Sequence, residues 1–173
     1  MTTVWIFVLV ATGALAIFAG LALRNRRNDA DLAKAISTMR SIDMEAFGNL
    51  VDPREEVFLR QNLPPRKFRE IRRERARAAM GYAWCAGQAA SQFASVGEAA
   101  RHSADPAIAA AGAQIAESAM RLRLDAMRTL IRLAASAYLP GMGAVEAPPL
   151  IGDYERTADT LLRLGRLQRG QAT

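Results

Sequence analysis

The sequence predicts an all-α protein in which a single N-terminal transmembrane helix precedes a long, Ala-rich antiparallel helical hairpin, braced by shorter helices into a small bundle. Three observations predict this class. Residues 4–23 are apolar and uncharged, residues 66–139 carry two long helical patterns, and no segment alternates between apolar and polar residues as a β-strand does. A chain of 173 residues leaves room for one modest soluble domain after such an anchor.

The apolar run from Val4 to Leu23 has the length of a membrane anchor, because twenty helical residues rise about 30 Å, the hydrocarbon thickness of a bilayer. A cleaved signal peptide and a buried core helix are the alternatives. A signal peptide would begin with a basic n-region, which residues 1–3 do not provide, and its plausible cleavage site, residues 14–16, lies inside the apolar run. The basic sequence RNRR at residues 24–27 predicts a cytoplasmic location for the rest of the chain. Residues 1–27 are therefore expected to be a single-pass anchor with a basic flank in an inner (plasma) membrane.

Composition argues against several kinds of site. Ala and Arg dominate and only two lysines are present, which is typical of GC-rich bacterial coding. One cysteine, Cys85, and one histidine, His102, cannot form an internal disulfide or a self-contained His/Cys zinc site. The chain also lacks a Gly-rich phosphate loop, an HExxH motif and a nucleophile elbow. We therefore expect no catalytic residue, no cofactor and no metal site, and Cys85 is expected at a core or interface position.

Residues 28–65 are expected to form short juxtamembrane helices. Apolar residues at i, i+3, i+4 and i+7 predict an amphipathic helix at residues 32–39. Asp43 precedes a second helical pattern, and Asp52, followed by proline, has the pattern of an N-cap with Glu55 in the capping-box position. The Leu-Pro-Pro sequence that follows ends this helix and begins the next, because proline disfavours helix before it and suits a first helical turn.

Residues 66–139 are expected to form the hairpin. The helical pattern continues unbroken to His102, and Asp105, followed by proline, marks the start of a second helix. Two helices of roughly 35 residues, each about 50 Å long and joined by so short a turn, must fold back on each other. The facing pairs expected from a symmetrical turn are Tyr82 with Leu124, Trp84 with Leu122, and Phe93 with Ala113.

The second helix of the hairpin carries two apolar stripes, which predict two packing partners. The first stripe consists of Ile108, Ile115, Leu122, Ala126 and Leu133, and the second of Met120, Leu124, Met127, Ile131 and Tyr138. We expect the helices of residues 43–62 and the C-terminal helix to cover the second stripe. Residues 140–152 are expected to be a linker, and residues 153–173 an amphipathic helix and tail with Asp153 as N-cap.

Two arginines fall among apolar positions. Arg75 projects into the apolar face of the first long helix, and Arg123 lies between the two stripes of the second. A buried guanidinium without a partner is costly, so each should pair with an acid or extend its charged end to the surface. The candidate partners for a buried ion pair are Asp125, Asp159, Glu155 and the acids within residues 52–56.

Most of the formal net charge of +6 is concentrated in residues 66–77, which hold seven basic and two acidic side chains. Glu70 and Glu74 lie at helical pair spacings from basic neighbours. The side chains expected to remain available to a polyanion are Arg66, Lys67, Arg69, Arg73 and Arg77. Anionic lipid headgroups and solvent are the alternatives for this basic cluster, whereas nucleic acid is disfavoured because Phe68 is the one interleaved aromatic residue.

These features predict a non-enzymatic scaffold or adaptor at a bacterial membrane, whose hairpin contacts a partner protein or a second copy of the chain. The reasons are a helical surface of small residues suited to close packing and the lack of a recognisable active-site motif. A module that binds anionic lipid or shapes the membrane through residues 66–77 is the alternative. An enzyme is least favoured, although a helical bundle can build a site without a linear motif.

Overall fold

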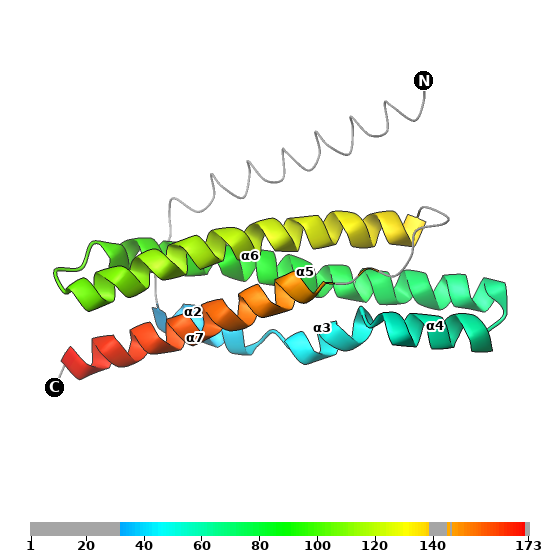
Figure 1. Ribbon diagram of the computed structural model, residues 1–173, viewed down its shortest axis with the longest axis horizontal. Coiled ribbons are helices and arrows are strands. Elements are labelled where there is room, and N and C mark those ends of the chain that lie inside the picture. Colours follow the sequence, from blue (N-terminus) through cyan, green and yellow to red (C-terminus); the bar gives the residue numbers. More distant parts are fainter. Residues whose placement is uncertain (1–31, 139–144, 146, 172–173) are drawn as a thin grey trace, which may run out of the picture.

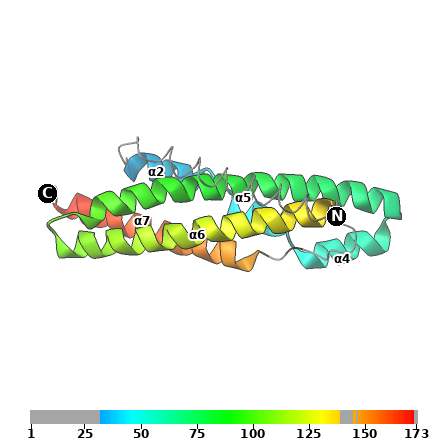
Figure 2. The ribbon, with the colours of Figure 1, turned by 90° about the horizontal axis from the view of Figure 1, so that it is seen from above.

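The computed structural model describes residues 32–138, 145 and 147–171, and within these ranges all regular elements are α-helices. The two long helices, α5 (Pro65–Arg101) and α6 (Pro106–Tyr138), form an antiparallel hairpin. Four others pack along it, namely α2 (Leu32–Arg40), α3 (Met44–Leu50), α4 (Pro53–Asn62) and α7 (Pro148–Gln171). These four lie below the hairpin in Figure 1, and Figure 2, which looks onto the hairpin from above, shows α2 alongside the outer edge of α5. The predicted all-α class and bundle-like packing are confirmed.

The predicted membrane anchor, residues 1–27, lies outside the described residues. The described part of residues 28–65 begins with Leu32, the first residue of α2. Among helices α2 to α7, none is both long enough and apolar enough to cross a bilayer.

Aspartate caps begin three of the helices. Asp43 at α3, Asp52 at α4 and Asp105 at α6 each accept a hydrogen bond from a backbone N–H of the first turn, at 2.9, 2.8 and 2.7 Å. These bonds satisfy donors that have no partner within the helix. Glu55 does not complete the capping box expected with Asp52, because its carboxylate contacts Arg75 of α5 instead.

The two long helices approach most closely at two glycines. A Cβ atom on Gly97 would lie 2.6 Å from the backbone nitrogen of Ala116, and one on Gly112 would lie 2.5 Å from that of Arg101. Both obstacles are backbone atoms, which cannot rotate aside, so glycine is required at both positions. Alanines buried on both helices extend the contact toward the base of the hairpin. The small residues that suggested a partner surface are therefore used largely within the hairpin itself.

The register of the hairpin differs from that of a symmetrical turn. Gly87 lies opposite Ala126, at 3.4 Å from its added Cβ to the Ala126 Cβ, and Gly97 lies opposite Ala116. A symmetrical turn would place these glycines opposite residues 119 and 109. The offset of seven residues is about two helical turns, so the same faces meet at shifted positions.

Because of this offset, the facing pairs predicted from a symmetrical turn are wrong. Those pairs are Tyr82 with Leu124, Trp84 with Leu122, and Phe93 with Ala113. Tyr82 packs instead against Phe47 of α3, and Phe93 packs against Tyr154 of α7, each with 6.3 Å between ring centroids. Aromatic pairs at this separation with tilted rings are favourable. The aromatic side chains of α5 thus attach the smaller helices to the hairpin.

The last helix, α7, begins at Pro148, five residues before the start predicted at Asp153. Residues 148–152 are helical rather than linker, because proline is accommodated in a first turn and Leu150 is fully buried. Tyr154 on the next turn is buried, and its hydroxyl donates a 2.6 Å hydrogen bond to the carbonyl of Met39. Burial raises the pKa of Tyr154 to about 12, so the phenol keeps the proton that it donates.

The second apolar stripe of α6 remains largely exposed. The first stripe is buried throughout, whereas Met120, Leu124, Ile131 and Tyr138 are 56, 42, 49 and 59 % exposed. The prediction that the helices of residues 43–62 and the C-terminal helix cover this stripe is wrong. Their large apolar side chains, including Phe47 and Tyr154, pack on the other side of the hairpin, so no described helix is left to cover it.

Candidate functional site

Arg75 connects three helices at the base of the hairpin. Its guanidinium donates hydrogen bonds to the carbonyl oxygens of Asn49 and Leu50 at the end of α3, at 2.9 and 3.1 Å. It also forms an ion pair with Glu55 of α4. A cation is favourable at a helix C-terminus, where the carbonyl groups lack intrahelical partners. The structure thus brings one acid of residues 52–56 to Arg75.

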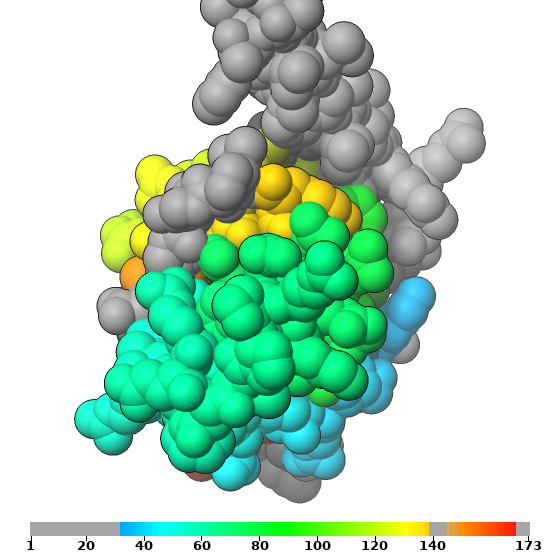
Figure 3. Space-filling view, turned by 90° about the vertical axis from the view of Figure 1, so that its right-hand side faces the viewer, coloured from blue at the N-terminus to red at the C-terminus, as the bar shows by residue number. Residues whose placement is uncertain are grey.

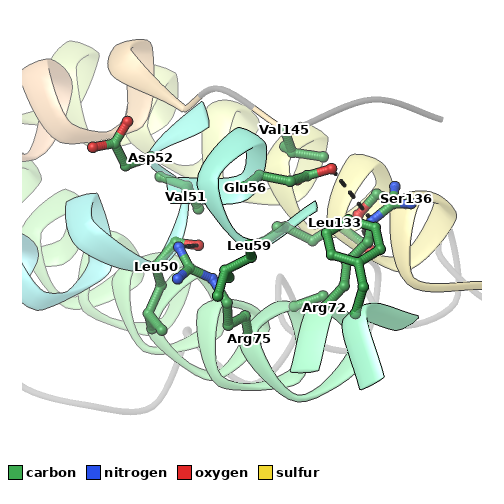
Figure 4. Close-up of a pocket in the computed structure, with 12 residues that line it drawn as sticks. Leu50, Val51, Asp52, Glu56, Leu59, Arg72, Arg75, Leu133, Ser136 and Val145 are labelled. Atoms are coloured by element: carbon green, nitrogen blue, oxygen red, sulfur yellow. Dashed lines mark hydrogen bonds and ion pairs between the residues drawn. The ribbon is translucent and has the colours of Figure 1, made fainter. Parts of the chain in front are cut away.

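A small pocket lies beside this junction (Figure 4), with a volume of about 30 Å³. Glu56 of α4 and Arg72 of α5 point toward one another across it, with 3.7 Å between Oε1 and Nε. Arg60 approaches the same carboxylate oxygen at 3.6 Å. The volume is about that of one water molecule, far below that of a ligand site. The pocket therefore has a structural role, in which Glu56 joins α4 to α5.

Two carboxyl groups meet between α6 and α7. Asp125 and Asp153 are both largely buried, and their side chains are in hydrogen-bond contact. Burial, and next the contact with Asp125, raise the pKa of Asp153, whereas Arg156 at 2.8 Å acts in the opposite direction. Arg128 lies 3.3 Å from Asp125 on the same helix. Sequence reasoning missed this pair because it placed Asp153 at a helix cap, and only the packing of α7 brings it to Asp125.

At neutral pH, Asp153→Asn should stabilise the protein by about 1 kcal/mol, because an amide can donate to Asp125 without burying a second charge. A carboxyl group whose pKa is raised by folding stabilises the folded state below its unfolded pKa. That contribution is lost as the pH rises through the folded pKa. We therefore expect the melting temperature of the wild type to fall between acid and neutral pH by more than that of Asp153→Asn.

The matched control is Asp159→Asn, an exposed position on the same helix. Its melting temperature should follow that of the wild type at every pH. Parallel pH curves for the wild type and Asp153→Asn would contradict the assignment of a destabilising carboxyl pair.

The remaining candidates for a buried ion pair lie elsewhere. Asp159 and Glu155 are exposed on α7, and in the described part of the chain no ion pair reaches either of them. The prediction of a buried pair at Asp159 is wrong, because this side of α7 faces solvent. Arg123 is half-buried on α6. Asp125 pairs with Arg128 of its own helix rather than with an arginine of another element.

The basic cluster is exposed along the start of α5. Its members are Arg66, Lys67, Arg69, Arg73 and Arg77. The arginines of the cluster line an open groove together with Glu70 and Glu74, yet across the described residues no ion pair joins the cluster to either acid. Figure 3 looks at this end of the molecule, where α4 and the start of α5 form most of the surface. The positive charge of the cluster therefore faces solvent, without an ion pair to an acid of the described residues.

A second surface feature, an open and mainly apolar groove, runs between α2 and α5. Tyr82, Trp84 and Cys85 of α5 line it, together with Thr38 and Ile42 from the α2 side. Trp84 is 43 % exposed and Cys85 is also exposed, so of the two positions expected for Cys85, core or interface, the core is excluded. Sequence reasoning missed the exposure of Trp84; a large aromatic residue in an otherwise Ala-rich segment was the available signal.

Among the described residues, no group of three or more His, Cys, Asp or Glu side chains is placed to hold a metal ion. The chain matches no known family model, and no curated protein or solved structure shows significant similarity to it.

Proposed function

We propose that this chain is a single-pass, membrane-anchored, non-enzymatic scaffold that holds its helical hairpin at the cytoplasmic face of a bacterial inner membrane. The observation that best supports the proposal is a set of large apolar side chains left exposed on packed helices. They are Val57, Phe58, Trp84, Met120, Leu124, Ile131 and Tyr138. They form two groups, Val57 and Phe58 on α4 and the other five on the hairpin. Exposed apolar residues that gather on a surface indicate a site of interaction. The glycine contacts between α5 and α6 hold most of them in a fixed arrangement.

The proposed anchor, residues 4–23, would keep this surface near the bilayer. Only residues 24–31 separate the apolar run from the first described helix. Eight residues reach at most about 28 Å when fully extended. The bundle would therefore remain within about one bilayer thickness of the membrane surface.

On α4, Val57 and Phe58 offer a contact site for a partner protein. The two side chains are adjacent and are 54 and 62 % exposed. They belong to a helix that Arg75 and Arg72 fasten to the hairpin through Glu55 and Glu56. An apolar pair on a fixed helix can fill a pocket of a partner with little loss of conformational entropy.

The test uses the full-length chain in its native membrane, with a photoreactive amino acid in place of Phe58. We expect the chain to resist extraction by alkaline carbonate and to form a discrete adduct with one protein. The matched control is the same amino acid in place of Glu45, an exposed polar position on α3, which should give no adduct. Release by carbonate, or the lack of a protein adduct at Phe58, would contradict the scaffold function.

Binding of anionic lipid is the second candidate function. The specific observation in its favour is that the basic cluster, Arg66, Lys67, Arg69, Arg73 and Arg77, is exposed and has no acidic partner in the described residues. Each basic residue near an anionic surface contributes about 1 kcal/mol of binding free energy. For a scaffold anchored at a membrane, the bilayer surface would be the nearest anionic surface.

A further inference from the structure

We propose that the hairpin lies flat on an anionic bilayer through one continuous surface, here called the open face. It is formed by Trp84 of α5 together with Met120, Leu124, Ile131 and Tyr138 of α6. The inference rests on the membrane anchoring proposed above, and it names what the larger part of the exposed apolar surface contacts.

The four residues of α6 in the open face share one side of that helix. At 100° per residue they project within about 40° of one another. Leu122 and Ala126, which are fully buried, project from the opposite side. The stripe from Met120 to Tyr138 is about 27 Å long, so it presents an extended surface rather than an isolated apolar patch.

Trp84 lies on the same side of the hairpin. Phe93, nine residues later, is half a helical revolution away and packs on Tyr154 of α7, so Trp84 projects away from α7. The contact of Gly87 with Ala126 places Trp84 level with residue 129, between Leu124 and Ile131 along α6. Helices α3, α4 and α7 pack on the other side, whereas α2 runs along the edge of α5, where Trp84 also lines the groove between α2 and α5. Figure 2 views the hairpin from the side of the open face.

Positive charge continues the open face toward the base of α5. Arg77 precedes Trp84 by seven residues, and Arg73 and Arg66 repeat the same helical face, so all three project on the Trp84 side. All three are exposed, and no ion pair joins them to an acid in the described residues. Acids also lie on this side: Glu70 and Glu74 line the same groove as these arginines, and near the turn Glu98 pairs with Arg101 and Glu117 pairs with Arg121.

This combination fits an anionic bilayer better than another protein. Arginines suit the lipid phosphates, Trp84 and Tyr138 suit the headgroup boundary, and the aliphatic side chains suit the upper acyl region. A second copy packed on the open face in the same orientation would place its Arg66, Arg73 and Arg77 against those of the first copy, where the like charges repel. The proposed anchor would hold the hairpin close to the bilayer, because only residues 24–31 connect the two.

The experiment places a nitroxide label on the full-length chain in vesicles. In a Cys85→Ser background, a single cysteine replaces Met120 or Leu124, and the matched control replaces Val57 on α4, away from the open face. The vesicles contain phosphatidylcholine with or without phosphatidylglycerol. With phosphatidylglycerol at low salt, labels at 120 and 124 should be reached by oxygen and shielded from a water-soluble nickel complex. The label at 57 should remain accessible to nickel.

Removal of phosphatidylglycerol, or addition of salt, should expose the labels at 120 and 124 to nickel, because the headgroup attraction is screened. Replacing Arg66, Arg73 or Arg77 with glutamine should lower the ratio of docked to undocked hairpin about fivefold per residue. Replacing the exposed Arg163 of α7 in the same way should leave the ratio unchanged.

Three results would overturn the proposal. In anionic vesicles, labels at 120 and 124 that remain as accessible to nickel as the label at 57 would show that the open face does not touch lipid. Dipolar broadening between labels at Met120 would show that a second copy covers it. Failure of the chain to reconstitute as an integral protein would overturn the anchor and the proposed function together, whereas the first two results overturn only the lipid contact.

Discussion

Gly112→Ala should destabilise the protein by about 2 kcal/mol or more, even though alanine is the better helix former. The new Cβ would lie 2.5 Å from the backbone nitrogen of Arg101 and 2.7 Å from the carbonyl oxygen of Gly97. Neither atom can move without moving its helix, so α5 and α6 must separate along their closest contact. Urea unfolding followed by circular dichroism, with wild type and variant in the same detergent, measures the loss.

Gly81→Ala is the matched control, because it lies in α5 and no atom lies within 4 Å of its added Cβ. This variant should gain about 0.5–1 kcal/mol from helix propensity alone. Opposite signs for Gly112→Ala and Gly81→Ala would support the tight hairpin contact. A gain in stability for both would mean that the helices are not in backbone contact at Gly112.

Arg75→Met should lower the free energy of unfolding by about 2 kcal/mol. Methionine conserves most of the apolar stem but leaves the carbonyl groups of Asn49 and Leu50 without the donors that now satisfy them. The ion pair contributes less, because the side chain of Glu55 is 53 % exposed and its charge is screened by solvent. Thermal and urea unfolding of the full chain measure the effect.

Two further variants distinguish the contribution of the ion pair from that of the hydrogen bonds to the end of α3. Glu55→Gln removes the ion pair alone and should cost less than about 1 kcal/mol. Arg73→Met, at an exposed position on the same helix, should stay within about 0.5 kcal/mol of the wild type. An unchanged or raised melting temperature for Arg75→Met would contradict the view that α3 and α4 depend on this arginine.

Local sequence signals predicted the positions at which most helices begin. Asp52 and Asp105 cap their helices as expected, and Asp43 caps the helix predicted to begin after it, because a cap depends only on a side chain and the N–H groups of the next few residues. Asp153 shows the limit of the same signal. Its sequence context is that of a cap, but burial of Leu150 extends α7 backward and places Asp153 against Asp125.

The arrangement of the hairpin faces could be predicted only in part. Periodicity identified both stripes of α6 and the buried residues of the first, since the helical repeat alone determines which side chains share a side. Which stripe receives a partner depends on where α3 and α7 pack. The register offset likewise depends on the glycine contacts at Gly97 and Gly112, which a symmetrical turn does not reveal.

By itself, the sequence determined the all-α class, the bounds of the long helices to within a few residues, and an exposed basic cluster at the start of α5. These features depend on interactions among residues close in the chain. Only the tertiary structure decided that Arg75 caps α3, that Asp125 meets Asp153, and that one apolar stripe stays exposed beside Trp84. Each of these depends on which helix faces which, and that choice follows from the closest backbone approach and from competition among side chains for the same core.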